Sequence, residues 1–157
     1  MPETPSAAFA TLRTLLTTQR LAVVATQQNG HPYTSLVAYV ASDDLRRIAF
    51  VTSRATTKYR NLTEVPDVSL LIDSRTHSVE DFTAGAAVTV LGRAAERGDT
   101  QEPALLAAFL RKHPHLESFA RSPSTALCTV DVKTYSLVTQ FQQVVEMQVD
   151  DWSSSNP

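Results

Sequence analysis

The sequence predicts a mainly β protein, a small antiparallel β-barrel with helices at its periphery. Short apolar runs rich in β-branched residues recur along the chain, and turn-forming residues separate them. Helical patterns stand at the margins of these runs and do not alternate with them. This order argues against a doubly wound parallel sheet and favours an antiparallel sheet of six or seven strands with two or three helices.

The first predicted element is a helix over about residues 6–18. The segment Thr4–Ser6 supplies a capping hydroxyl and a proline suited to a first helical turn. Phe9, Leu12 and Leu16 then recur at helical spacing, which predicts one apolar face.

Three strands are predicted next, LAVVAT from Leu21, YTSLVAYVA from Tyr33 and IAFVT from Ile48. The turn signal Asn29–Gly30 separates the first two, and the polar segment SDDLRR separates the last two. Strands joined by such short turns indicate an antiparallel meander.

A short helix over about residues 56–64 is expected after the third strand, ending before Pro66. The strand VSLLID, the polar loop SRTHSVEDFTAG and the strand AAVTVLGRAAE follow it. Gly92 in the last of these predicts a β-bulge or the close approach of another backbone.

The C-terminal third predicts a helix that begins at Pro103, an irregular or briefly helical segment HPHLESFARSPS, and two strands broken near Lys133. We expect one domain over residues 1–157, with residues 1–5 and 150–157 frayed. Trp152 lies in that tail but could dock against the barrel.

Composition excludes several classes of protein. The hydrophobic share of 43% and charged share of 19% are typical of a globular domain, and a net charge of −2 offers nucleic acid no general attraction. We find no signal peptide and no membrane-spanning run, so we expect a cytoplasmic protein. The single Cys128 excludes an internal disulfide and a cysteine-based zinc site; we expect it to be buried.

The segment VTSRATTKYRNL, from Val51 to Leu62, is the strongest candidate for a binding site. It leads from a strand into a helix whose first turn holds Thr57 and Lys58. Free backbone N–H groups, hydroxyls and a lysine at a helix start can bind an anion such as phosphate. An ordinary capped helix start with an exposed lysine is the alternative.

An ordered set of motifs resembles the FMN-binding split β-barrels of the pyridoxamine 5′-phosphate oxidase-like superfamily. The resemblance covers about residues 8–96 and is carried by Gly30-x-Pro32, Thr52, Thr57-Lys58, Asn61-Leu62 and Pro66-x-Val68-Ser69-Leu70. It implies a Greek-key split barrel that forms a homodimer, with FMN in a groove between the two chains.

The same resemblance implies the cofactor-binding residues. Beside the flavin ring and ribityl chain would lie Thr34, Ser35, Leu36 and Val37. Around the phosphate would lie Val51, Thr52, Thr57, Lys58, Ser74 and Arg75. The partner chain would contribute residues around Ala87 and the final strand near Gln140.

The chain departs from the oxidases proper, which carry arginines where Thr34 and Thr57 stand and a glutamine near Ala87. Arg54 or Arg75 could compensate for the lost cations. The arginine-rich C-terminal part that binds the substrate phosphate has no counterpart here, so we do not expect pyridoxamine phosphate to be the substrate.

The sequence therefore predicts an FMN-binding flavoprotein that exchanges electrons or hydride with an unidentified small molecule. Backbone groups near Ser35 to Val37 would stabilise charge on the reduced ring, and no side chain need act as acid or base. The alternatives are an F420-dependent reductase, a non-enzymatic module that binds haem or flavin, and a domain used only in assembly.

Three histidines bear on these alternatives. His77 could approach a flavin, and His113 or His115 could serve as an axial haem ligand. We predict no metal-ion site, because His113 and His115 flank a proline with no third ligand spaced nearby.

Overall fold

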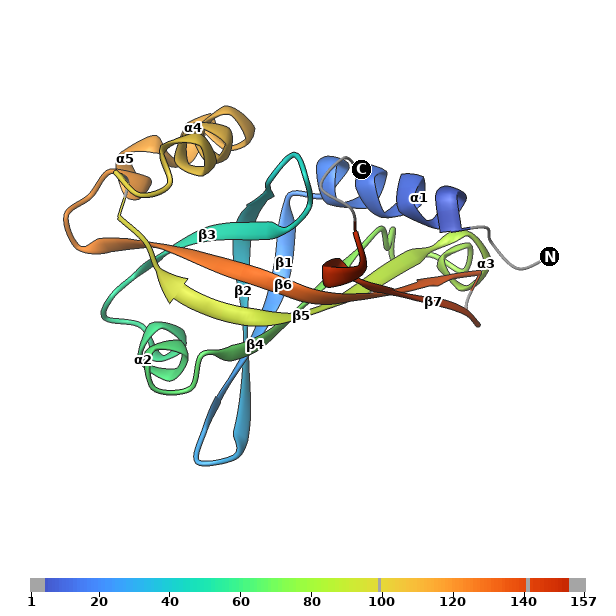
Figure 1. Ribbon diagram of the computed structural model, residues 1–157, viewed down its shortest axis with the longest axis horizontal. Helices are drawn as coiled ribbons and strands as arrows, with labels where there is room; N and C mark the ends of the chain where they lie inside the picture. The colour runs from blue at the N-terminus through green and yellow to red at the C-terminus, as the bar shows by residue number, and fades with distance from the viewer. Residues whose placement is uncertain (1–4, 99, 141, 153–157) are drawn as a thin grey trace.

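The computed structural model describes residues 5–98, 100–140 and 142–152 of the 157-residue chain. All seven strands of this part form one antiparallel sheet in the order β3-β2-β1-β4-β5-β6-β7. The sheet closes into a six-stranded barrel because β3 also pairs with β6, and β7 extends it beyond β6 (Figure 1). The predicted antiparallel barrel is therefore confirmed. Its strands are β1 (Leu21–Gln28), β2 (His31–Ala41), β3 (Arg47–Ser53), β4 (Asp67–Asp73), β5 (Ala86–Glu96), β6 (Thr125–Thr139) and β7 (Gln143–Gln148).

Five α-helices lie outside the barrel in the described part of the chain. They are α1 (Pro5–Thr18), α2 (Thr57–Glu64), α3 (Asp81–Ala84), α4 (Pro103–Lys112) and α5 (Glu117–Ala120). Short 3₁₀ turns follow at Pro114–Leu116 and Val149–Asp151. α1, α2 and α4 agree with the predicted helices, whereas α3 adds one helical turn to a segment predicted as a polar loop. No helix in the described residues is both long and apolar enough to cross a membrane.

The barrel interior is packed by the alternate side chains of its strands, as the period of two in a strand requires. The largest fully buried side chains include Tyr39, Phe50, Ile72, Tyr135 and Leu137. Two of them satisfy their polar ends on backbone, since the Tyr39 hydroxyl donates to the Leu16 carbonyl (3.0 Å) and the Tyr135 hydroxyl to the Leu45 carbonyl (2.6 Å). Cys128 is buried, as expected, and burial raises the pKa of its thiol to about 12.

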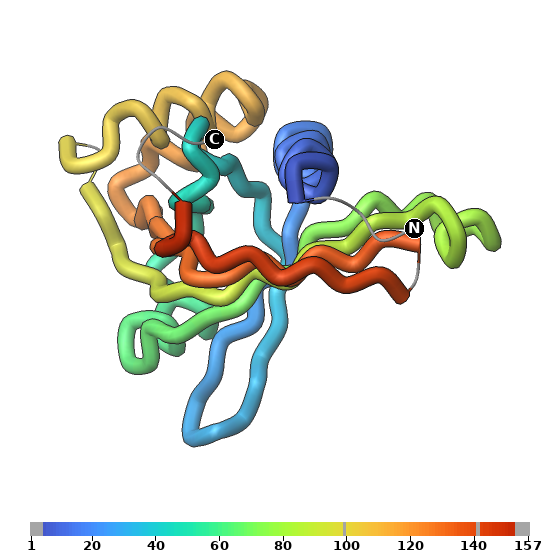
Figure 2. The backbone as a smooth tube through the Cα atoms, turned by 45° about the vertical axis from the view of Figure 1, so that its right-hand side comes forward, coloured from blue at the N-terminus to red at the C-terminus, as the bar shows by residue number. Residues whose placement is uncertain are grey.

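The helices cover different parts of the barrel. In Figures 1 and 2, α1 lies on the opposite side of the sheet from the projecting β1–β2 hairpin, and α4 lies beside α5. Leu12 and Leu16 of α1 belong to the main core. Phe109 of α4 forms a second core with Val40 of β2 and Val51 of β3, so α4 covers the region where these two strands approach each other.

The predicted break near Lys133 is wrong, because β6 runs without interruption from Thr125 to Thr139. The local irregularity is a β-bulge. Leu91 lies opposite Thr134 and Gly92 opposite Val132, which leaves Lys133 as the extra residue. A Cβ on Gly92 would lie 2.4 Å from the Asp131 carbonyl oxygen, so this position requires glycine. The bulge and close approach predicted at Gly92 are both present.

The predicted fraying of residues 150–157 needs a correction where the structure describes them. Residues 1–4 and 153–157 lie outside the described parts, but Trp152 packs edge-on against Phe9 and stacks on Tyr135. The Trp152 carbonyl also accepts a hydrogen bond of 2.9 Å from Arg46 Nη2. The end of the described chain therefore docks onto the barrel, as the sequence allowed for this tryptophan.

Candidate functional site

The barrel opens between β2 and β3, which pair only near the turn that joins them. Residues 39–41 of β2 lie opposite residues 48–50 of β3. Beyond that point residues 31–38 of β2 pair with β1, and residues 51–53 of β3 pair with β6. The edge of β2 that faces β3 therefore carries backbone N–H and C=O groups that no strand of the described chain pairs. Thr34, Ser35, Leu36 and Val37, the residues predicted to lie beside a flavin, stand on this stretch.

At the end of β3 the chain turns into α2 and forms a small hydroxyl-rich corner. Thr52 is buried, and its Oγ1 lies 3.0 Å from Thr56 Oγ1. Thr56 caps α2, because its Oγ1 accepts a hydrogen bond from the Tyr59 N–H (3.3 Å). Lys58 Nζ donates to Thr52 Oγ1 at 3.4 Å. We call Thr52, Thr56, Thr57 and Lys58 the anion corner; Thr57 is the first residue of the helix.

The residues behind the anion corner keep α2 in place. Asn61 and Leu62 are buried, and Asn61 Nδ2 donates to Thr26 Oγ1 of β1 at 3.1 Å. Thr26 in turn donates to the Tyr33 carbonyl of β2 (3.4 Å). The middle of α2 is thus fixed to β1, and through Thr26 to β2, the strand whose unpaired edge faces the opening.

No carboxylate of the described residues neutralises the charge of the anion corner. No ion pair of the described residues includes Lys58, and burial lowers the pKa of its amine. The hydroxyl of Ser35 on β2 is buried without a hydrogen-bond partner among the described residues. Buried polar atoms normally have partners, so Ser35 is an exception on the stretch of β2 predicted to lie beside a flavin.

The two arginines expected to assist the lysine are occupied elsewhere. Arg54 Nε donates to Glu96 Oε1 at 2.9 Å, and the Tyr59 hydroxyl donates to Glu96 Oε2 at 2.5 Å. Arg75 Nε donates to Asp73 Oδ1 at 2.8 Å. The sequence analysis missed these carboxylates. Asp73 stands two residues before Arg75, a spacing that could have indicated the pair, whereas Glu96 is separated from Arg54 by 42 residues.

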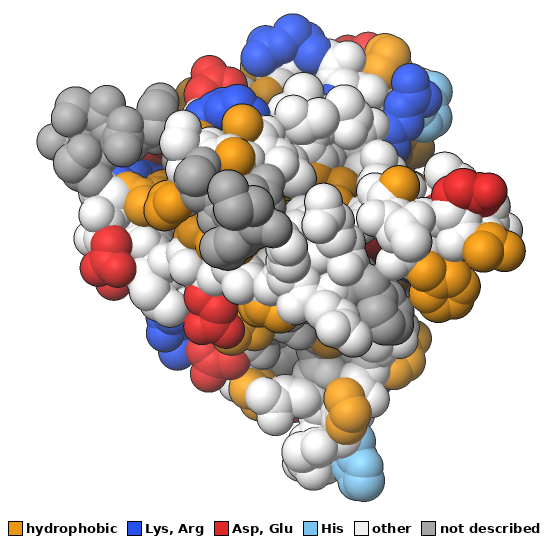
Figure 3. All heavy atoms as spheres, turned by 90° about the vertical axis from the view of Figure 1, so that its right-hand side faces the viewer, with side chains coloured by type: hydrophobic (Ala, Val, Ile, Leu, Met, Phe, Trp, Pro, Cys, Tyr) orange, Lys and Arg blue, Asp and Glu red, His pale blue; other side chains and the backbone are white. Residues whose placement is uncertain are grey.

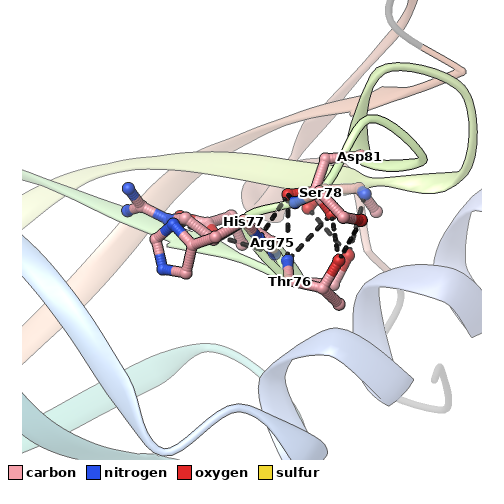
Figure 4. A network of polar contacts seen from close by, with 8 residues as sticks. Arg75, Thr76, His77, Ser78 and Asp81 are labelled. Atoms are coloured by element: carbon pink, nitrogen blue, oxygen red, sulfur yellow. Dashed lines mark hydrogen bonds and ion pairs between the residues drawn. The ribbon is translucent and has the colours of Figure 1, made fainter.

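The segment that carries Arg75 is held rigid by Asp81 (Figure 4). The Asp81 carboxylate accepts hydrogen bonds from the backbone N–H groups of Thr76, His77 and Ser78 at 2.8, 2.8 and 3.3 Å, and these bonds lower the pKa of Asp81. Ser74 is engaged with β5, since its Oγ accepts from the Ala86 N–H at 2.9 Å. Neither Ser74 nor Arg75 contacts the anion corner through any described hydrogen bond.

Four other predicted residues line hollows on the outer face of the sheet or at its margin, namely Leu36, Arg75, His77 and Ala87. One hollow of about 550 Å³ is lined by Leu36, Leu71, Arg75 and His77, among others. A second, of about 450 Å³, is lined by Leu71, Arg75 and Ala87. The structure thus forms two groups from the predicted site, the anion corner and an outer-face group around Leu71.

Three further predictions are placed as follows. Val51 is buried beneath α4 and presents no exposed side chain. Gln140, expected near the final strand, lies in the turn between β6 and β7 with a positive φ of 48°. His113 is 1% exposed and its Nε2 donates to the Tyr39 carbonyl at 2.8 Å, whereas His115 is exposed. His113 is therefore not free to ligate haem iron.

A protein-family model described as pyridoxamine 5′-phosphate oxidase matches residues 9–139. The chain belongs to this family. No curated protein sequence matches the chain.

Three solved structures illustrate the range of this fold. A haem binding protein from Mycobacterium smegmatis superposes with a TM-score of 0.80 at 20% identity, over 91% of this chain and 58% of its own length. HutZ, a haem storage protein from Vibrio cholerae, gives a TM-score of 0.70 at 16% identity, over 89% and 96%. A FAD-binding protein from Mesorhizobium loti gives 0.65 at 18% identity, over 82% and 91%. At these identities the likeness shows the fold alone.

Proposed function

We propose that this member of the pyridoxamine 5′-phosphate oxidase family binds FMN, with the flavin phosphate on the anion corner. The observation that carries the proposal is Lys58, a partly buried lysine without a carboxylate partner among the described residues, beside Thr52 and the start of α2. A doubly charged phosphate would receive the lysine charge, hydroxyl hydrogen bonds and the free N–H groups of the first helical turn.

The opening of the barrel suits the rest of the flavin. The unpaired edge of β2 offers backbone donors and acceptors along residues 34–37, and the partnerless Ser35 hydroxyl lies on the same stretch. A flavin ring has hydrogen-bonding groups along its polar edge and an apolar face, which matches an unpaired strand edge. When bound, FMN supplies one- and two-electron redox chemistry. The chain would position it and exclude water.

The outer-face group supports a homodimer. Leu36 of β2 is 63% exposed, Leu71 of β4 38% and Leu91 of β5 48%. Val23 of β1 lies between Leu36 and Leu71 in the sheet register. An apolar surface shared by adjacent strands favours burial against a second copy of the same surface. In such a dimer Arg75 and Ala87 of one chain could complete the site of the other.

Comparing FMN with riboflavin tests the proposal, because riboflavin lacks only the phosphate. Titration of the purified protein, followed by quenching of flavin fluorescence, should give an affinity for FMN at least about tenfold higher than for riboflavin. Competition with F420 addresses the alternative cofactor, and reduction of the bound flavin by NADH or NADPH addresses turnover. Equal affinities for FMN and riboflavin would exclude the anion corner as a phosphate site.

A haem-binding module is the second candidate, because similar folds include haem binding and storage proteins. The supporting observation is the outer-face hollow, in which the exposed His77 lies beside Arg75, Leu36 and Leu71. Haem requires an axial ligand, apolar contact and cations for its carboxylates. A haem titration of the protein and of His77→Ala tests this candidate: tight binding that the substitution weakens would favour it over FMN.

A further inference from the structure

A third hollow of the barrel is lined by Arg54, which stands between Thr52 and Thr56 in the sequence, but by no residue of the anion corner itself. It forms where β5 leaves the sheet toward α4 and where β6 enters it from α5 (Figure 1). Its volume is about 490 Å³, within the range of about 300–1,000 Å³ typical of small-molecule sites. Among its lining residues are Arg54, Glu96, Arg97, Arg121, Ser122 and Thr125, and we call it the arginine hollow.

The lining of the arginine hollow is positively charged. Three arginines face one carboxylate, Glu96, which is paired with Arg54. Arg97 Nη2 lies 3.8 Å from Asp131 Oδ2, too far for a hydrogen bond. Arg121 pairs with Glu117 at 3.1 Å, but both side chains are more than half exposed, and such pairs hold little free energy. Arg97 and Arg121 can therefore turn their donors to a ligand at small cost.

Two buried polar atoms in this hollow have no partner in the described part of the chain. They are Arg97 Nε, a donor, and Oγ1 of Thr125, a residue that is only 8% exposed. A buried donor or hydroxyl left unpaired costs about 1–3 kcal/mol. Both atoms are closed to solvent, so the Arg97 and Thr125 side chains would have to turn toward the hollow for an acceptor bound there to relieve this cost. Charge, room and unpaired donors thus indicate the same kind of ligand, a compact anion with several oxygens.

We propose that the arginine hollow binds a phosphate group, either free or as the ester of a small molecule. Guanidinium groups donate pairs of parallel hydrogen bonds that match phosphate oxygens, and the Thr125 hydroxyl is a second kind of donor. The site is separate from the proposed flavin site, because Thr52, Thr57 and Lys58 do not line it.

The test is a titration with inorganic phosphate in the Lys58→Ala background, which removes the other candidate anion site. Backbone amide NMR shifts of Ser122 and Thr125 report on the hollow. We expect saturable shifts that sodium chloride at equal ionic strength does not reproduce. Adding Arg97→Gln should weaken phosphate binding by roughly tenfold or more, and Thr125→Val should weaken it several-fold.

Arg93→Gln is the matched control, because Arg93 also belongs to the β5 region but forms an exposed ion pair with Asp67 outside the hollow. It should leave phosphate binding unchanged. No saturable shift, or equal loss in Arg93→Gln and Arg97→Gln, would overturn the proposal. If Arg97→Gln fails to fold, Arg121→Gln, at an exposed position, replaces it.

Glycerol 3-phosphate distinguishes the two sources of the phosphate group. Tighter binding than that of inorganic phosphate identifies an ester as the ligand, and equal or weaker binding identifies the free ion. Failure of the flavin proposal would not affect these readings, because it would appear in the unaltered protein as a lack of preference for FMN over riboflavin.

Discussion

Lys58 is the residue whose environment most constrains function. Its amine is partly buried, donates to Thr52 and has no ion pair in the described chain. Burial of a lysine without a carboxylate costs free energy, which an anionic ligand would recover. The motif alone indicated a lysine at a helix start. It could not show that Arg54 and Arg75 are bound to Glu96 and Asp73, since long-range contacts decide that.

The pH dependence of FMN binding should reveal this lysine. Because burial lowers the pKa of Lys58 below its usual 10.5, the amine loses its proton and the affinity for FMN falls at a pH below that value. On the acid side, affinity falls as the phosphate dianion takes up one proton and becomes a monoanion, at about pH 6. Flavin fluorescence titrations across this range measure both limbs. In Lys58→Met the alkaline limb should vanish; an unchanged alkaline limb would assign it to another group.

His113 should make stability sensitive to acid. Burial is the main cause that lowers its pKa, and the positive charges of Lys112, His115 and Arg20 lower it further, against the hydrogen bond to the Tyr39 carbonyl. The unfolded chain then binds more protons than the folded chain between the lowered pKa and the usual 6.5. The contribution is thus complete above pH 6.5 and is lost as the pH falls through this window.

Urea unfolding midpoints between about pH 5 and pH 8 measure this effect, since histidine titrates there. His113→Gln, which can still donate to the Tyr39 carbonyl, should flatten the acid side of the profile. His115→Gln, at an exposed position, should change the profile much less, because the charge of His115 is a smaller cause of the lowered pKa of His113 than burial is. A profile that responds equally to both substitutions would show that burial of His113 is not the cause.

At the scale of elements, strands and helices follow closely from local pattern. The alternation of apolar residues predicts the strands, and the proline and threonine at helix starts predict α1, α2 and α4. The wrong prediction among the strands has its cause in long-range strand pairing. The break expected near Lys133 is a bulge because β5 holds β6 on one side while β3 and β7 hold its two ends on the other. Such pairing depends on strands that are distant in sequence. The opening between β2 and β3 also depends on long-range pairing, because β1 and β6 pair with the parts of β2 and β3 that do not pair with each other.

Gly92→Ala should destabilise the barrel at this bulge. The new methyl would lie 2.4 Å from the Asp131 carbonyl oxygen and 2.7 Å from Val130 Cγ1, so β5 and β6 must move apart. Overpacking of this kind typically costs about 1–3 kcal/mol of unfolding free energy, measurable by urea denaturation. Gly98→Ala is the control, because its nearest new contact would be 3.7 Å away. Equal effects of the two substitutions would contradict the close approach at Gly92.

On the scale of the whole molecule, the net charge is small, −2 at pH 7. The face in Figure 3 has acidic and basic side chains among separate apolar groups, in keeping with the net charge of −2. An apolar row on the outer face of the sheet is formed by the exposed side chains of Leu36, Leu71 and Leu91. This row, rather than charge, is the surface through which we propose that two copies associate.

Leu71→Lys should therefore separate the proposed dimer. A lysine in the middle of the row would place a charge in the apolar interface, and two copies would face each other across the symmetry axis. Sedimentation should give twice the chain mass of 17.2 kDa for the unaltered protein and 17.2 kDa for the variant. Val79→Lys, on a loop residue that is 78% exposed, should remain dimeric. An unaltered protein of 17.2 kDa would exclude the dimer.

The central claim is that the anion corner binds the phosphate of a flavin, and its most direct test is the ratio of FMN to riboflavin affinity in Lys58→Ala. We expect the substitution to weaken FMN binding by roughly tenfold to a hundredfold, the range for a hydrogen bond to a charged group, and to leave riboflavin binding unchanged. Arg60→Ala, which removes an exposed cation from the same helix, should alter neither affinity. An FMN preference that survives in Lys58→Ala would contradict the account.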